Sequence, residues 1–177
     1  RDLFMTRGYA NTSVADIAAR AGVSVDTLYA SVGRKPQLLL AVHDMELAEG
    51  DAPLQATERD YVKRIRAAAS AVEMIEIYVD ALTRLLPRTV PLLESLRVAG
   101  QTDRECLEAY ALVSQRRAAN MHQFASELRA TGELRDDLDD NAVADLLWSL
   151  NAPDYFLLLR ARGRTPRRRP RSARARR

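Results

Sequence analysis

The chain has 177 residues, enough for one domain or for a small unit joined to a second domain of about 100 to 150 residues. It holds no run of about 18 or more uncharged apolar residues, which excludes a membrane span. Its single cysteine, Cys106, excludes an internal disulfide framework and fits a reducing compartment, so we expect a cytoplasmic protein. Abundant Ala, Leu and Arg with few glycines favour an all-α fold.

The formal net charge of +3 conceals two opposed regions. Residues 160–177 carry ten arginines and no acid, which leaves 17 basic and 24 acidic residues, a balance of −7, in the rest of the chain. Segment 164–177 has two prolines, dense like charge and no apolar periodicity, so we expect a disordered tail that is attracted to polyanions. The tail is either an auxiliary nucleic-acid arm or an altered terminus.

Residues 12–35 contain two short amphipathic segments joined by a tight turn. The first runs from about Val14 to Arg20, after a cap at Ser13 or at the alternative Thr12, and its apolar residues recur at three- and four-residue spacing. Gly22 follows where the chain must reverse, because a left-handed backbone conformation is nearly free only for glycine.

The second segment runs from Val25 to about Ser31, after a cap at Ser24. The residues expected to face inward are Val23, Val25, Leu28 and Val32. The outward residues are small or polar, which suits a helix that enters a major groove about 12 Å wide; they are Asp26, Thr27, Ala30 and Ser31. This layout indicates a DNA-reading helix-turn-helix, although ordinary helical bundles also contain capped helices around a glycine turn.

Further residues extend this pattern over nearly every position from Leu3 to Val42. They are Leu3, Phe4, Gly8, Tyr9, Thr12, Ser13, Val14, Asp16, Ile17, Ala18, Ala21, Gly22, Val23, Ser24, Thr27, Leu28, Tyr29 and Lys35. Together they resemble the N-terminal signature of TetR-type transcriptional regulators. The resemblance implies a homodimeric, all-helical repressor that releases its operator in double-stranded DNA when a small molecule enters the larger C-terminal domain.

Carried over position by position, the resemblance implies a set of DNA contacts. Thr27 and its outward neighbours would face base edges, Tyr29 and Lys35 would contact phosphates, and Ser13 would contact a phosphate from the first helix. The full DNA-binding set is Thr12, Ser13, Ser24, Val25, Asp26, Thr27, Tyr29, Ala30, Ser31 and Lys35.

The chain departs from the family pattern at two places in this region. Ala30, Ser31 and Val32 stand where the family usually has an aromatic residue followed by His-Phe, so part of the expected DNA contact is missing. The operator sequence is therefore not predictable. The chain also begins at Arg1, inside the expected first helix, so we expect that helix to be truncated.

Beyond this region the pattern predicts helix after helix. The predicted domains are 1–45 (helix-turn-helix DNA-binding domain), 46–163 (helical effector-binding and dimerisation domain) and 164–177 (the Arg-rich tail). The predicted helices span residues 36–49, 59–69, 71–86, 92–100, 103–131, 141–150 and 153–162. Pro87 and Pro91 are expected to bracket a joint between two helices, and capping boxes are expected at Ser70 and Thr102.

The long helix over 103–131 carries an apolar stripe at alternating three- and four-residue steps, typical of a helix packed lengthwise against others. With the next helix it would form half of a four-helix dimer interface, as the resemblance to TetR-type regulators implies, unless the stripe faces only the chain's own core. Two recognition helices about 34 to 36 Å apart on a twofold axis would read a palindrome. The interface candidates are Ala118, Met121, Ala125, Leu128, Leu146, Leu147 and Leu150.

An effector pocket is expected on the helices that surround the ligand cavity in relatives, although each candidate is also an ordinary core residue. Apolar walls with Met, aromatic residues and a few polar groups suit a hydrophobic or amphipathic organic effector of unknown identity. The candidates are Met74, Tyr78, Leu82, Leu92, Leu93, Leu96, Arg97, Tyr110, His122 and Trp148, with Glu94 as a further polar group.

Catalysis has little support in the sequence. The two histidines, His43 and His122, each lack a second His or Cys at ligand spacing. No phosphate-binding loop, nucleophile elbow or HExxH motif occurs, and the acidic run from Asp136 to Asp140 lacks the Gly and terminal Glu of a calcium loop. We expect no enzymatic activity, metal or cofactor.

Two hypotheses from different classes follow. The first is a ligand-responsive dimeric repressor of transcription. The alternative is a fragmentary or altered regulator that mainly binds polyanions non-specifically through residues 164–177. A third interpretation, a helical enzyme, would require a cluster of titratable groups in the cavity that spacing alone does not reveal.

Overall fold

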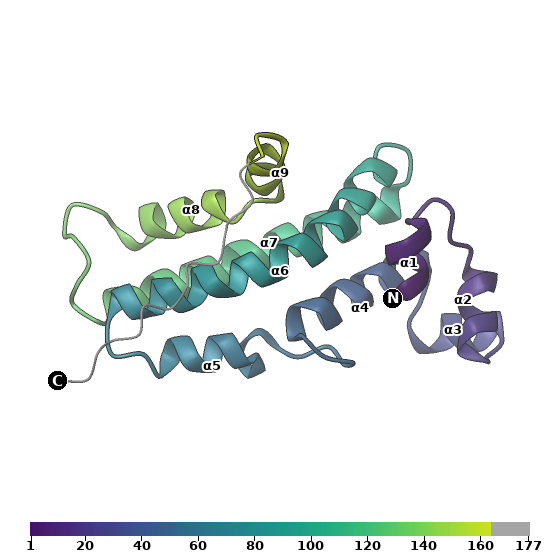
Figure 1. Cartoon of the computed structure of the whole chain (residues 1–177), viewed down its shortest axis with the longest axis horizontal. Helices are drawn as coiled ribbons and strands as arrows, with labels where there is room; N and C mark the ends of the chain where they lie inside the picture. Colours follow the sequence, from purple (N-terminus) through teal and green to yellow (C-terminus); the bar gives the residue numbers. More distant parts are fainter. Residues whose placement is uncertain (164–177) are drawn as a thin grey trace.

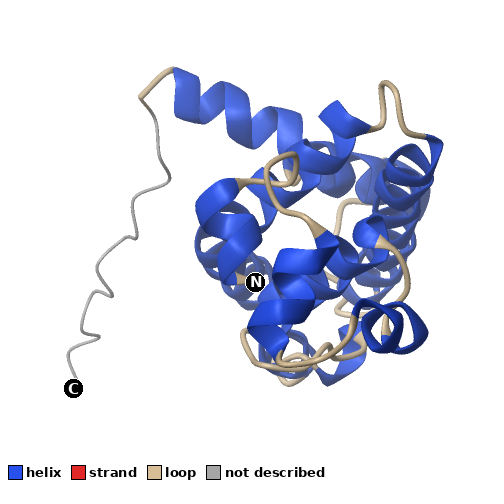
Figure 2. Cartoon of the chain, turned by 90° about the vertical axis from the view of Figure 1, so that its right-hand side faces the viewer, coloured by secondary structure: helices blue, strands red, loops and turns tan. Residues whose placement is uncertain are grey.

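The computed structural model describes residues 1–163, and every regular element in that range is a helix (Figures 1 and 2). α1 (Asp2–Arg7), α2 (Val14–Ala21) and α3 (Val25–Ser31) form a helix-turn-helix unit at one end of an elongated molecule (Figure 1). None of the described helices has the length and apolar composition that a membrane span requires. The all-α prediction is confirmed, and the predicted tail lies outside the described residues.

The larger part of the chain is built on a hairpin of two long helices, which run along the length of the molecule (Figure 1). The helices beyond the helix-turn-helix unit are α4 (Lys35–Ala48), η1 (Ala56–Glu58), α5 (Asp60–Arg66), α6 (Ala71–Ala99), α7 (Arg104–Arg129), α8 (Asp140–Leu150) and α9 (Pro153–Ala161). α6 and α7 form the hairpin. α5 and α9 pack against α6, and α8 returns along α7.

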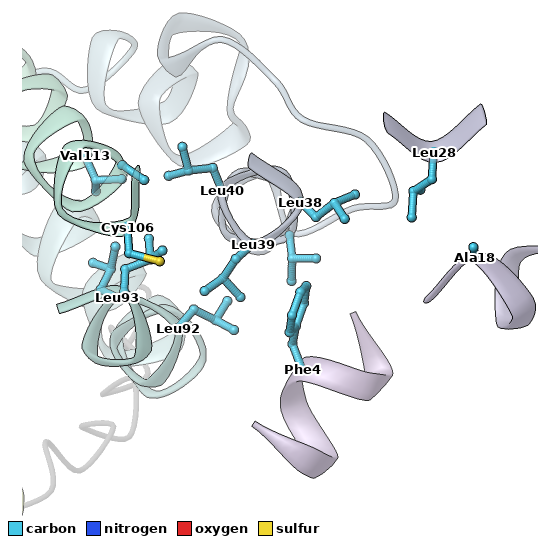
Figure 3. Close-up of a cluster of buried hydrophobic side chains, with 13 residues drawn as sticks. Phe4, Ala18, Leu28, Leu38, Leu39, Leu40, Leu92, Leu93, Cys106 and Val113 are labelled. Carbon is cyan, nitrogen blue, oxygen red and sulfur yellow. The ribbon is translucent and has the colours of Figure 1, made fainter. Parts of the chain in front are cut away.

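The connecting helix α4 is buried on several sides and joins the helix-turn-helix unit to the hairpin. Figure 3 shows Leu38 pointing toward Leu28 of α3 and Leu40 pointing toward Val113 of α7, with the fully buried Leu39 between them. A helix with apolar residues around much of its circumference is stable only when it is enclosed. One continuous core therefore runs from α1, α2 and α3 through α4 into α6 and α7.

A second core lies between α5, α6, α7 and α8. The ring centroids of Tyr78 and Phe124 are 5.0 Å apart at its centre, with the rings tilted by 57°. Its buried residues are Ile65, Ala71, Met74, Tyr78, Met121, Phe124, Ala125, Leu128 and Ala144. The two cores account for most of the apolar periodicity of the sequence.

The joint predicted between Pro87 and Pro91 is absent, because α6 continues through both prolines. Proline cannot donate to the carbonyl four residues earlier, which usually breaks a helix. Both prolines here lie on the exposed side of α6, where water can hydrate the carbonyls that lose their donor. Leu85 and Val90 are buried on the other side, so tertiary packing outweighs the local defect.

Neither predicted capping box forms in full, because the Glu73 carboxylate accepts from the amide of Ala69, at 3.0 Å, in place of the Ser70 amide. The Ser70 hydroxyl does cap α6, since it accepts the amide hydrogen of Glu73 at 3.2 Å. Thr102 does not cap α7. The carboxylate of Asp103 takes that place and accepts from the amide of Glu105 at 2.9 Å, because a carboxylate one residue later reaches the same unpaired amides.

Candidate nucleic-acid interface and ligand cavity

The turn between α2 and α3 has the caps that the sequence predicts. Ser13 and Asp16 form a reciprocal capping box, with the Asp16 amide 3.0 Å from the Ser13 hydroxyl. The hydrogen bonds from Ser13 lower the pKa of Asp16. Gly22 ends α2 with a φ of 68°, and the Ser24 hydroxyl accepts from the Thr27 amide at 3.0 Å to begin α3. These local contacts set the angle at which α3 leaves the turn.

Small and branched residues hold α2 against α3. Ala18 is 2% exposed and Leu28 is 8% exposed in the shared core. Ile17 and Val25 are partly buried against it. Burial of this face leaves the opposite side of α3 free.

Two residues predicted to face inward are exposed. Val23 is 39% exposed because it lies in the turn rather than on either helix. Val32 is 40% exposed because α3 ends at Ser31, so the helical spacing no longer applies to it.

Most of the predicted DNA contacts form an exposed set on α3 and at the starts of α2 and α3, here called the predicted DNA surface. Ser13, Ser24, Asp26, Thr27, Tyr29, Ala30 and Ser31 are all exposed. The Thr27 hydroxyl lies 2.8 Å from that of Ser24, and the Ser31 hydroxyl donates to the carbonyl of Leu28 at 3.1 Å. The surface therefore presents short polar groups held close to the α3 backbone, together with the phenol ring of Tyr29.

Thr12 does not belong to this surface. It is 1% exposed, and its hydroxyl lies 2.7 Å from the Gly8 carbonyl and 3.2 Å from the Leu3 carbonyl. A buried hydroxyl engaged within the protein cannot reach a phosphate. Thr12 instead fixes the loop between α1 and α2, which corrects the prediction made for it.

Lys35 lies at the first residue of α4 and is partly buried. Its Nζ atom is 4.0 Å from the centroid of the Tyr9 ring, within the range of a cation–π contact. Burial lowers the pKa of Lys35. In this structure the ammonium group is thus held against Tyr9, in the loop between α1 and α2.

Three exposed arginines lie near this surface and were not among the DNA contacts predicted from the sequence. Arg20 pairs with Asp2 at 2.8 Å, Arg7 approaches Asp16 at 3.8 Å, and Arg34 pairs with Glu105 of α7. Exposed ion pairs contribute little to stability, so these side chains can exchange a carboxylate for a phosphate. No local signal marks them, because residues 1–35 hold only five of the chain's 27 basic residues.

Polar contacts tie the helix-turn-helix unit to the start of α7. The Tyr9 hydroxyl lies 3.1 Å from Sγ of the buried Cys106. Burial and this hydrogen bond raise the pKa of Tyr9, while burial raises the pKa of Cys106. The Arg34 pair with Glu105 is a second link between the same elements.

A cavity of about 520 Å³ lies in the larger part of the molecule. Of the predicted pocket residues, Tyr78, Leu82 and Leu93 line it. Its volume falls within the range of about 300 to 1,000 Å³ that is usual for small-molecule sites. Residues of α4, α5, α6 and α7 and the joint between α8 and α9 contribute to its wall.

The other predicted pocket residues lie elsewhere. Met74 is core, and Leu92 and Leu96 pack in the core shared with the helix-turn-helix unit, with Tyr110 beside them. Arg97 is exposed and pairs with Glu94 on its own helix, which raises the pKa of Arg97. His122 and Trp148 line a separate pocket of about 190 Å³. Apolar periodicity identified the helices but not which side of each faces the cavity.

The polar wall of the cavity was missed entirely. It includes Arg59, Arg116, Arg117 and Asn151. The Arg117 Nε atom donates to Asn151 Oδ1 at 3.1 Å, and Asn151 donates to the hydroxyl of Tyr78. These residues come from distant parts of the sequence and form no local motif.

The predicted dimer residues separate into two groups. Met121, Ala125 and Leu128 are buried in the chain's own core, so they are not available to a partner. This burial corrects the prediction for them. Leu146 and Leu150 are 54% and 56% exposed, while Ala118 and Leu147 are partly buried.

Residues 1–163 contain no group of three or more His, Cys, Asp or Glu side chains arranged to hold a metal ion. The described part of the chain thus offers a polar helix surface at one end and an organic-sized cavity in the middle.

Comparisons with known proteins identify the class of protein. Residues 1–42 match the family described as bacterial regulatory proteins, tetR family. The chain is 34% identical over 163 residues to the HTH-type transcriptional repressor Rv3405c of Mycobacterium tuberculosis (strain ATCC 25618 / H37Rv), and the match covers 82% of this chain and 84% of that protein. The HTH-type transcriptional regulator Mb3439c of Mycobacterium bovis matches with the same identity and coverage. No solved structure matches significantly.

The protein is a DNA-binding transcriptional regulator of the helix-turn-helix class. The chain belongs to the TetR family.

Proposed function

We propose that this chain is a homodimeric repressor that binds a palindromic operator through α2 and α3. A small molecule in the 520 Å³ cavity would release it from the DNA. The observation that carries the proposal is the exposed polar side of α3, with Asp26, Thr27 and Ser31, above a face buried through Leu28. The name of the mycobacterial repressor supports repression rather than activation.

Exposed apolar side chains on the last two described helices support dimerisation. Leu146 and Leu150 of α8 are 54% and 56% exposed, and Tyr155 and Leu158 of α9 are 42% and 61% exposed. Contiguous apolar surface on a soluble protein commonly marks an interface. A second copy with the same surface would cover these residues in a twofold arrangement, and two recognition helices would then face one duplex.

α4 supports a link between the cavity and the DNA-binding surface. Leu38 and Leu39 near its start belong to the core shared with the helix-turn-helix unit. His43 and Asp44, about one turn further on, line the cavity. A ligand that binds one position of α4 better than another shifts the helix-turn-helix unit, and its differential affinity sets the size of the response.

The same proposal places the protein in the cytoplasm, where bacterial DNA is accessible, and assigns it no enzymatic reaction or cofactor. Residues 164–177 would add sequence-independent affinity through their arginines.

A reporter assay tests repression directly. A DNA site selected by the purified protein is placed between a promoter and a reporter gene in a bacterial host. We expect the chain to lower reporter output. Ser31→Glu should abolish the effect because it adds negative charge beside the phosphates, and Ser126→Glu, at an exposed position of α7, should leave it intact. Unchanged or increased output with the unmodified chain would refute the proposal.

A further inference from the structure

The charged side chains in the cavity wall are unevenly matched. Four arginines and one histidine face two carboxylates. The charged residues are His43, Asp44, Arg59, Arg66, Arg116, Arg117 and Glu127. A charged ligand would be attracted mainly by those side chains whose charge the protein does not already neutralise.

Both carboxylates have partners in the wall itself. Asp44 lies 3.1 Å from Arg116 and 3.3 Å from Nδ1 of His43. Burial would raise the pKa of Asp44, but His43, Arg116 and the more distant Arg59 outweigh it and lower the pKa. Glu127 pairs with Arg66 at 2.9 Å.

Arg59 is one of the two arginines left over. It is 9% exposed, and its Nε atom is buried with no hydrogen-bond partner. Its Nη2 atom reaches only the Leu54 carbonyl, at 3.5 Å. Within residues 1–163 it forms no ion pair of 4.0 Å or less. A buried charged group that no carboxylate contacts directly is costly, so this position favours an anion.

Arg117 is the second arginine of the cavity wall that pairs with neither of the two wall carboxylates. Its guanidinium is held by Asn151, by the Trp148 carbonyl at 3.0 Å and over the Trp148 ring at 5.3 Å. All of these groups are neutral, and Arg117 has no carboxylate partner among the described residues. Burial lowers its pKa, and the more distant Tyr78, Tyr110 and Asp154 offset this only in part.

The rest of the wall is largely apolar. It includes Leu82, Leu85, Leu93, Val113 and Phe124 from α6 and α7. A ligand that satisfies this wall therefore needs an apolar body as well as a negative charge.

We propose that the cavity binds an amphipathic organic acid, with its carboxylate against Arg59 and its apolar body against the leucines of α6. Arg117 adds a second positive charge to the same wall. The inference rests on the proposed function, which makes this cavity the effector site, and it specifies the chemical class of the effector.

Ligands that differ only in their head group test the proposal on the unmodified chain. Decanoate, decanol and decylamine are titrated while the fluorescence of Trp148, the single tryptophan, reports binding through its contact with Arg117. We expect decanoate to bind about tenfold more tightly than decanol, and decylamine more weakly than either. Equal binding of the three, or no binding of decanoate up to its solubility limit, would overturn the inference.

Arg59→Met removes the charge but keeps an apolar side chain of similar reach. We expect it to reduce decanoate binding to the level of decanol, while Arg64→Met, at an exposed position of α5 outside the cavity wall, leaves the preference unchanged. Thermal melting shows whether Arg59→Met is folded, and the head-group comparison stands without it. A preference for decanoate that persists in folded Arg59→Met would overturn the assignment to Arg59.

Operator affinity, measured in the same titrations, separates this inference from the proposed function. Intact operator binding with no preference for the acid refutes the inference and leaves the repressor proposal standing. Tight decanoate binding that leaves operator affinity unchanged supports the inference and refutes release of DNA through this cavity.

Discussion

The hydroxyl of Tyr9 lies 3.1 Å from Sγ of Cys106, which joins the loop after α1 to the first turn of α7. The contact connects the helix-turn-helix unit to the hairpin of α6 and α7. Other residues of these two helices line part of the cavity. It also places Tyr9 between Cys106 on one side and the ammonium group of Lys35 over its ring.

Replacing Tyr9 by Phe should lower the free energy of unfolding by about 0.5 to 1.5 kcal/mol, because one hydrogen bond is lost while the ring remains. Urea denaturation measures the change. Tyr29→Phe, measured without DNA, is the matched control, since Tyr29 is 45% exposed, and it should have almost no effect. Equal effects of the two substitutions would show that the contact with Cys106 does not stabilise the fold.

Stability should fall in alkaline solution partly through Tyr78, because burial raises the pKa of Tyr78 to about 12. A tyrosine in the unfolded chain ionises near pH 10. The stabilising contribution is therefore complete below about pH 10 and is lost as the pH rises toward about 12, by about 1.4 kcal/mol per pH unit.

Tyr78→Phe tests this linkage. Urea denaturation between about pH 9 and pH 11 should show a shallower loss of stability in the variant than in the unmodified chain. Tyr29→Phe, at an exposed position, should keep the steeper dependence. Parallel pH profiles for Tyr78→Phe and the unmodified chain would contradict the buried ionisation.

Thr27→Ala and Tyr29→Ala should change DNA binding in different ways. Tyr29→Ala should weaken binding to all sequences alike and leave the salt dependence nearly unchanged, because the phenol contacts a phosphate without neutralising it. Thr27→Ala should change which bases are preferred. Fluorescence anisotropy over a panel of sites and salt concentrations measures both, and unchanged discrimination by Thr27→Ala would remove that residue from the base contacts.

The double substitution Leu146→Glu with Leu150→Glu should convert a dimer to a monomer, because it places two charges in the proposed interface. Sedimentation velocity gives the oligomeric state. Val72→Glu is the matched control: Val72 is 65% exposed on α6, outside the interface. A dimer that survives the double substitution would place the interface elsewhere.

The sequence was sufficient for the features that depend on close neighbours. Ser13, Gly22 and Ser24 act on amides within three residues or on their own backbone angles, so their roles follow from spacing alone. Thr12 was misassigned because its buried hydroxyl binds the carbonyls of Leu3 in α1 and Gly8 in the loop after it, which no local pattern reveals.

Features that depend on tertiary packing could not be predicted from the sequence. Met121 and Leu128 have the same spacing whether they face the chain's own core or a partner, and only the return of α8 along α7 decides between these alternatives. Arg59 and Arg117 are ordinary surface residues in any local pattern. They become a ligand site only because α5 and α7 enclose the same cavity.

Selection of bound sequences from a random DNA pool tests the central claim most directly, namely that the exposed side of α3 reads DNA in a twofold pair. The full chain and a chain without residues 164–177 are compared. We predict that both enrich the same palindromic site, with half-sites about 34 to 36 Å apart, and that the shorter chain shows a weaker salt dependence. Enrichment of no sequence, or loss of nearly all DNA affinity with the tail, would contradict the account.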